Sequence, residues 1–220
     1  TEAMTQAEQD SRVKVIVFAG NGDLFTAGND INDFLNSPPD SKDSPVVKFL
    51  EKLVSTDMPL LAAVQGRAVG IGTTMLFHCD KVYAAQGTIF TTPFVSLGLV
   101  PEAASSLLMP KHIGYQRAAQ MILFGESLSC DDAKAWGLVS ELCAADELMA
   151  KVMADAQRIA LLPSRALRTS KRLLRRAEEP LLDRIQHEMV EFGLALSSAE
   201  ASEAMTAFAE KRPPNFSQFD

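Results

Sequence analysis

Short apolar runs alternate with longer amphipathic stretches in the first half of the chain. The apolar runs lie at 13–18, 60–64, 81–85 and 88–90, and each is bounded by polar residues, glycine or proline. Such runs are typical of buried strands. Between them, 45–56 and 72–78 have the spacing of helices, and strands that alternate with helices predict an α/β fold.

The second half of the chain has a different pattern. Helical patterns dominate past residue 103, at 103–110, 114–124, 130–136, 145–161, 164–177, 181–196 and 199–211. Glycine or proline separates several of them, as at Gly125, Gly137, Pro163 and Pro180. We therefore expect a strand-rich core over residues 1–125 and a helical region over residues 126–220.

Composition narrows the class of protein. The chain has 220 residues, of which 47% are hydrophobic, and a net charge of −7, so it can form a sizeable core and is a poor general binder of nucleic acid. Cys79, Cys130 and Cys143 are too far apart for a disulfide framework or a metal site, which suits a reducing, cytoplasmic location. No apolar stretch reaches the roughly 20 residues of a membrane span, so we expect no membrane partner.

Two glycine-bearing turns and one carboxylate supply the candidate chemistry. The turns, at 25–30 and 66–73, each follow an apolar run, and a turn that leads into a helix leaves backbone N–H groups unpaired. Glu102 is an isolated carboxylate in an apolar bend, where desolvation is expected to raise its pKa. Two N–H groups can hold an oxyanion, and one carboxylate can move a proton. Together they favour a reaction that transfers a proton next to a carbonyl.

In their order and spacing these segments resemble the crotonase superfamily, also called the enoyl-CoA hydratase/isomerase family. The resemblance covers residues 13 to about 139 and rests on FTAGNDI at 25–31, PLLAAVQG at 59–66, CDKVYAA at 79–85, LGLVP at 97–101 and AKAWGLV at 133–139. It implies a crotonase-like (ClpP/crotonase) spiral of ββα units with a C-terminal helical extension. It also implies an acyl-CoA substrate, no cofactor beyond the coenzyme A of that substrate, and a homotrimer or hexamer built through the C-terminal helices.

The same resemblance assigns roles to residues of this chain. Glu102 would be the catalytic acid/base, and the backbone N–H groups of Asn29 and Ile71 would form the oxyanion hole. The substrate-binding residues would be Ala27, Asn29, Asp30, Ile31, Ile71 and Phe94, the first four of them along coenzyme A.

Departures from the family pattern favour one reaction. Hydratases of this family use two glutamates, and this chain has Thr74 and Phe94 at the matching positions. Neither side chain titrates near neutral pH. PEAASS at 101–106 resembles the Pro-Glu-Gly-x-Ser-Ser element of the Δ3,Δ2-enoyl-CoA isomerase branch, with Ala103 in place of glycine. The resemblance therefore implies an isomerase that converts a 3-enoyl-CoA to a 2-enoyl-CoA through a dienolate.

Other interpretations stay open at this point. Glu102 taken alone is typical of a first-turn helix acid, Asp30 of an N-cap, and Phe94 of core or acyl-pocket wall. We expect Thr74 to be a buried helix hydroxyl and His78 a structural histidine. The basic helix at 165–176 suits a solvated face, a subunit contact or a contact with coenzyme A phosphates. The rival functions are a divergent hydratase or other acyl-CoA enolate enzyme, and a non-catalytic acyl-CoA or RNA-binding protein, although no interleaved aromatic residues support RNA binding.

The first residues match only the end of a longer family phrase, Asn-Ala-Leu-Thr-x-x-Met. Eight residues separate Met4 from Val13, which is fewer than the family's helix and turn require at about 1.5 Å per residue. We expect residues to be absent from the sequence both before Thr1 and between Met4 and Thr5.

Overall fold

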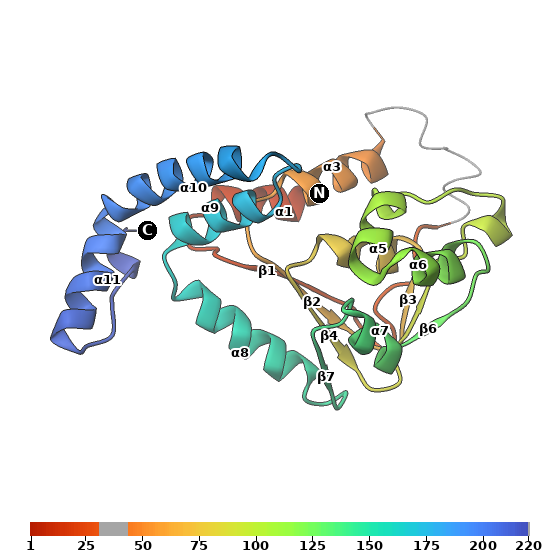
Figure 1. Cartoon of the computed structure of the whole chain (residues 1–220). Helices are drawn as coiled ribbons and strands as arrows, with labels where there is room; N and C mark the ends of the chain where they lie inside the picture. The colour runs from red at the N-terminus through yellow and green to blue at the C-terminus, as the bar shows by residue number, and fades with distance from the viewer. Residues whose placement is uncertain (31–43, 220) are drawn as a thin grey trace.

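A computed structural model describes residues 1–30 and 44–219 of the chain. Two small β-sheets lie at its centre, helices pack around them, and two helices near the C-terminus extend away from this body (Figure 1). The α/β class predicted from the alternating pattern is confirmed.

The larger sheet has four parallel strands in the order β1–β2–β4–β7. They are β1 (Ile16–Ala19), β2 (Leu60–Val64), β4 (Lys81–Ala85) and β7 (Glu141–Cys143). All five residues of β2 are buried, which explains its unbroken apolar sequence. Ala62 of β2 pairs with Phe18 on one side and Val82 on the other. The strands expected at 60–64 and 81–85 are confirmed, and the one expected at 13–18 begins at Ile16.

The smaller sheet has three strands in the order β3–β5–β6. They are β3 (Arg67–Val69), β5 (Ile89–Thr91) and β6 (Leu128–Ser129), with β3 and β5 parallel and β6 antiparallel to β5. An isolated parallel bridge between Thr26 and Ala68 ties the first glycine turn to the edge of this sheet. β3, β6 and β7 were not predicted, because strands of two or three residues are too short to show a periodicity.

The helical patterns of the second half are confirmed to within a few residues. The helices are α5 (Ser105–Ile113), α6 (Tyr115–Ile122), α7 (Cys130–Trp136), α8 (Leu148–Ala160), α9 (Ser164–Leu174), α10 (Leu181–Leu196) and α11 (Ala199–Glu210). Upstream lies α3 (Pro45–Ser55), whose N-cap Ser44 accepts a hydrogen bond from the Val47 amide. Short 3₁₀ turns are η2 (Val95–Leu97) and η3 (Ser217–Phe219). The helix expected at 72–78 consists of α4 (Ile71–Thr74), followed at once by the 3₁₀ turn η1 (Met75–His78).

The N-terminal segment forms a helix that its sequence pattern did not predict. α1 (Glu2–Gln9) crosses the Met4–Thr5 position without a break, and the Thr5 amide donates to the Thr1 carbonyl at 3.0 Å. The omission of residues expected between Met4 and Thr5 stays a prediction. This short helix buries Met4 in the main core.

Two hydrophobic clusters lie on opposite faces of the parallel sheet. Ala62 and Val64 belong to the larger cluster, whereas Leu61 and Ala63 belong to the smaller one, which α8 completes, as the period of two in a strand requires. β6, β7 and α8 all lie beyond residue 125, so the sheets extend past the boundary expected there. The helices that leave the body are α10 and α11 (Figure 1).

α9 is held against the body by cations of the basic segment. Lys171 is buried, and its ammonium donates to the Met58 carbonyl at 2.5 Å and contacts the Asp80 carboxylate at 2.6 Å. The guanidinium of Arg175, just past α9, donates to the His78 carbonyl at the end of η1. Part of the basic segment is therefore an internal anchor and not the solvated face that was one expectation.

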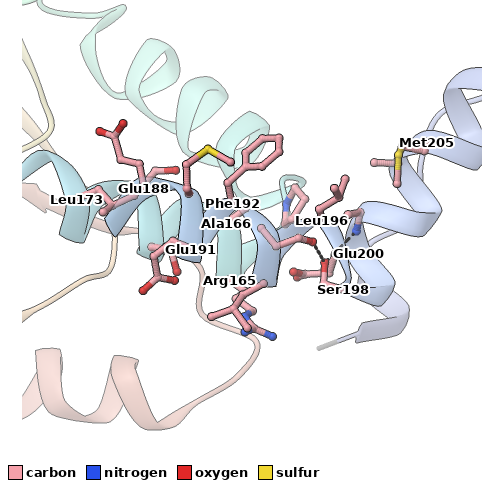
Figure 2. Close-up of a pocket in the computed structure, with 18 residues that line it drawn as sticks. Arg165, Ala166, Leu173, Glu188, Glu191, Phe192, Leu196, Ser198, Glu200 and Met205 are labelled. Atoms are coloured by element: carbon pink, nitrogen blue, oxygen red, sulfur yellow. Dashed lines mark hydrogen bonds between the residues drawn. The ribbon is translucent and has the colours of Figure 1, made fainter. Parts of the chain in front are cut away.

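α10 and α11 expose many large apolar side chains, among them Leu181, Met189, Phe192, Met205 and Phe208. A cavity of about 540 Å³ lies between these two helices and α9, with Phe192, Leu196 and Met205 among its lining residues (Figure 2). Within residues 1–30 and 44–219, no helix has both the length and the apolar character needed to cross a membrane.

Candidate active site

The two glycine turns predicted from the sequence lie directly against each other. The Thr26 amide donates to the Arg67 carbonyl at 3.2 Å, and the Val69 amide donates to the Thr26 carbonyl at 3.1 Å. A Cβ atom on Gly72 would lie 2.3 Å from Cγ2 of Thr26, and one on Gly28 would lie 2.9 Å from the Val69 carbonyl oxygen. Side chains at these two glycines would force the turns apart.

The two candidate oxyanion donors follow these contacts. Asn29 comes directly after Gly28, and Ile71 is the first residue of α4, directly after Gly70. The amides of both glycines are satisfied, one by the Thr26 hydroxyl at 3.1 Å and the other by the Thr91 carbonyl at 3.0 Å. Within the described part of the chain, the amides of Asn29 and Ile71 donate no hydrogen bond, so both can serve a ligand.

Glu102 lies against the same short helix. The hydroxyl of Thr74, in the first turn of α4, donates a hydrogen bond to a carboxylate oxygen of Glu102. Burial raises the pKa of Glu102, in agreement with the expectation from its apolar bend, and the Thr74 hydrogen bond opposes that shift. A half-buried carboxylate with a raised pKa is suited to take up a proton and return it.

The backbone after Glu102 is left-handed at two successive residues. Ala103 has φ 52° and Ala104 has φ 54°, which costs a residue with a side chain roughly 1–2 kcal/mol. Local hydrogen bonds hold this conformation. The Glu102 carbonyl accepts from the Ser105 amide at 2.9 Å and the Ser105 hydroxyl at 2.6 Å, and the Ala103 carbonyl lies 2.8 Å from Nε2 of His78. The bend therefore forms although Ala103 replaces glycine.

The remaining expected site residues are placed as follows. Ala27 and Asp30 are exposed in the turn that contains Asn29, and Ile31 lies outside the described residues. Phe94 is buried but belongs to neither hydrophobic cluster. Among the described residues, no three potential ligands are grouped as a metal ion would need.

Two residues that touch the site were not predicted to do so. Thr74 contacts Glu102, and His78 contacts Ala103, although the sequence indicated only a buried hydroxyl and a structural histidine. A threonine in the place of a hydratase glutamate was the available signal for the first. No signal in the sequence pointed to the second, because its partner is a backbone carbonyl 25 residues away.

Known proteins share both the sequence pattern and the fold. Residues 1–219 match the family model for enoyl-CoA hydratase/isomerase. The chain is 34% identical over 218 residues to enoyl-CoA delta isomerase 2 of Rattus norvegicus, covering 96% of this chain and 56% of that protein. It is 32% identical over 217 residues to the mitochondrial enoyl-CoA hydratase of Pongo abelii, covering 98% of this chain and 75% of that one.

A solved structure has the same arrangement of elements. It is an enoyl-CoA hydratase/carnithine racemase candidate from Magnetospirillum magneticum AMB-1, with a TM-score of 0.93 and 40% identity over 98% of this chain and 85% of that one. The chain spans about half the length of the curated delta isomerases that it matches, between 49% and 60%. Relatives named as isomerases and relatives named as hydratases both match, so their names do not select the reaction.

The contact between the turns predicts the effect of a methyl group at Gly28. Gly28→Ala forces a side chain into φ 93° and to 2.9 Å from the Val69 carbonyl oxygen, so we expect the free energy of unfolding to fall by about 2–4 kcal/mol. Gly22→Ala is the matched control, because φ is 82° there and nothing lies within 4 Å of the added Cβ; it should cost about 1 kcal/mol. Urea unfolding measures both values, and equal losses would contradict the close approach.

Proposed function

Because this chain belongs to the enoyl-CoA hydratase/isomerase family, we propose that it is an isomerase that moves the double bond of a 3-enoyl-CoA to the 2-enoyl position. Its crotonase-like fold is that of solved relatives. The observation that carries the proposal is the contact between Thr74 and Glu102. Thr74, whose hydroxyl cannot titrate near neutral pH, stands at the position that the resemblance assigns to a hydratase glutamate. Its hydroxyl donates to the carboxylate of Glu102, which lies in a separate bend.

The proposed chemistry needs one proton carrier. The C2 protons of a 3-enoyl thioester are acidic because the resulting anion is delocalised over the carbonyl and the double bond. Glu102 removes a C2 proton, and the negative thioester oxygen of the dienolate accepts hydrogen bonds from the amides of Asn29 and Ile71. Glu102 then returns the proton at C4, which yields the conjugated product. Hydration would also require a water molecule to be activated, and neither Thr74 nor Phe94 can do this.

The proposed substrate is an acyl-CoA, and its coenzyme A is the only cofactor moiety that the chemistry requires. Ala27, Asn29, Asp30 and Ile31 are proposed to lie along coenzyme A. Phe94 is proposed as a wall of the acyl pocket, which is supported by its burial outside both core clusters.

A divergent hydratase is the second candidate. The relatives named as hydratases support it, since the identity to the Pongo abelii hydratase is 32% against 34% for the Rattus norvegicus isomerase. The two reactions differ in whether water is added to the double bond, so the two products separate the candidates.

Glu102→Gln tests the assignment of the acid/base. The variant keeps the shape of the side chain and removes the base, so isomerase activity should fall on the order of 10²–10⁴-fold with little change in folding. The assay follows the absorbance of the conjugated 2-enoyl thioester formed from 3-enoyl-CoA. Glu178→Gln, at an almost fully exposed carboxylate, is the control. Near-normal turnover by Glu102→Gln would refute the assignment, and robust hydration of a 2-enoyl-CoA by the unmodified protein would favour the hydratase.

Thr74→Val tests the pKa of Glu102. It removes the hydrogen bond that lowers this pKa and leaves the burial that raises it, so the pKa should rise. Because the base must be ionised to take the C2 proton, the acid limb of the kcat/KM profile should move to higher pH. Thr88→Val is the control, since that buried hydroxyl donates to the Val64 carbonyl at 3.3 Å instead. An acid limb that stays at the same pH in Thr74→Val would contradict the proposed contact.

We also propose that the chain assembles as a homotrimer or hexamer. The support is the set of exposed apolar side chains on α10 and α11, which association would bury. Light scattering at micromolar concentration should therefore give the mass of three or six chains. A monomer mass under these conditions would be evidence against the assembly.

A further inference from the structure

We propose that His78 is a positioning residue for Glu102. Its imidazole holds the Ala103 carbonyl, and it thereby keeps the left-handed backbone that aims the Glu102 carboxylate. The inference rests on the proposed role of Glu102 as the base, and it adds a residue that the family resemblance does not assign to the site.

The contact between His78 and Ala103 has a defined direction. A carbonyl oxygen can only accept, so Nε2 of His78 carries the hydrogen that it donates over 2.8 Å. The imidazole is buried, and this burial lowers the pKa of His78. A neutral imidazole has a single N–H group, and here that group is directed at the residue next to Glu102.

His78 and Thr74 reach the same bend from one continuous segment. Thr74 ends α4, and His78 ends η1 four residues later. Thr74 contacts the Glu102 side chain, whereas His78 contacts the backbone that follows it. Glu102 is thus held at its carboxylate and through the backbone of the next residue.

His78 is itself anchored at its backbone. Its carbonyl accepts a hydrogen bond from the Arg175 guanidinium, and the neighbouring Phe77 packs edge-on against His112 of α5, with ring centroids 5.6 Å apart. Because His78 is held at its backbone, its hydrogen bond can keep the Ala103 carbonyl in place.

Ala103 explains why such a restraint is needed. Glycine adopts a positive φ readily, whereas alanine does so only when its surroundings hold it there. With φ 52° at Ala103 and 54° at Ala104, loss of the His78 hydrogen bond should allow the bend to relax and move the carboxylate away from Thr74. A displacement of about 1 Å is sufficient to cost on the order of 10²-fold in rate.

The first experiment compares three variants in the 3-enoyl-CoA assay. His78→Leu removes the donor and should lower kcat by about 10–100-fold, with a smaller change in KM because His78 is outside the proposed coenzyme A contacts. His78→Gln keeps an N–H donor and should retain kcat within about threefold of the unmodified protein. His187→Leu, at a half-exposed histidine of α10 that lies against Glu179, is the matched control and should leave kcat unchanged. Rates are normalised to folded protein by circular dichroism, since a purely structural role would lower the folded fraction and not its kcat.

The second experiment removes the backbone strain at Ala103 by introducing glycine. Adding Ala103→Gly to His78→Leu should restore at least about tenfold of the lost kcat, because glycine keeps the left-handed bend without a donor. If His78→Leu alone does not fold, the double variant and His78→Gln still test the positioning role of His78. Failure of the double variant to regain activity, or a glutamine variant as slow as the leucine variant, would overturn the proposal.

A crystal structure of His78→Leu separates this inference from the proposed function. Loss of the contact between Thr74 and Glu102 supports the positioning role, and a carboxylate that keeps this contact overturns it. An unmodified protein that converts no 3-enoyl-CoA would instead refute the isomerase assignment, while the crystal structure would still test His78.

Discussion

The approach of the Thr26 turn to α4, where Gly72 leaves room for the Thr26 side chain, is the constraint on which the candidate site depends. Gly72 and Gly28 lack the Cβ atoms that would otherwise meet Thr26 and the Val69 carbonyl. The residues that follow this contact, Asn29 and Ile71, are left with amides that have no internal acceptor among the described residues. Backbone packing therefore supplies the candidate donors for an oxyanion.

The segment from α4 to η1 connects this contact to the rest of the molecule. Its first amide, at Ile71, faces away from the helix, and Thr74 and His78 hold the bend that carries Glu102. Its last carbonyl receives Arg175, and the buried Lys171 fixes α9 beside it. Through these two cations the C-terminal half helps to hold a bend in the first half.

The electrostatics of Glu102 reflect two opposing effects. Burial disfavours the charged carboxylate, whereas the Thr74 hydroxyl favours it. The family contains relatives named for isomerisation and relatives named for hydration, and the proposed function assigns this chain to the first group because Thr74 and Phe94 cannot titrate near neutral pH. Thr74 is informative in both respects, because it cannot act as a base and it modulates the one carboxylate to which it donates.

The sequence by itself determined the long elements and the candidate residues. An unbroken apolar run located β2, and helical periodicity located α8 to α11, because both are local patterns; family motifs pointed to Glu102, Asn29 and Ile71. The tertiary structure alone decided what is not local. β3, β6 and β7 form only by pairing with other strands, and α1 packs Met4 where a gap in the chain was expected. The contacts of Thr74 with Glu102 and of His78 with Ala103 join residues 28 and 25 positions apart, and no rule of spacing along a strand or helix relates such positions.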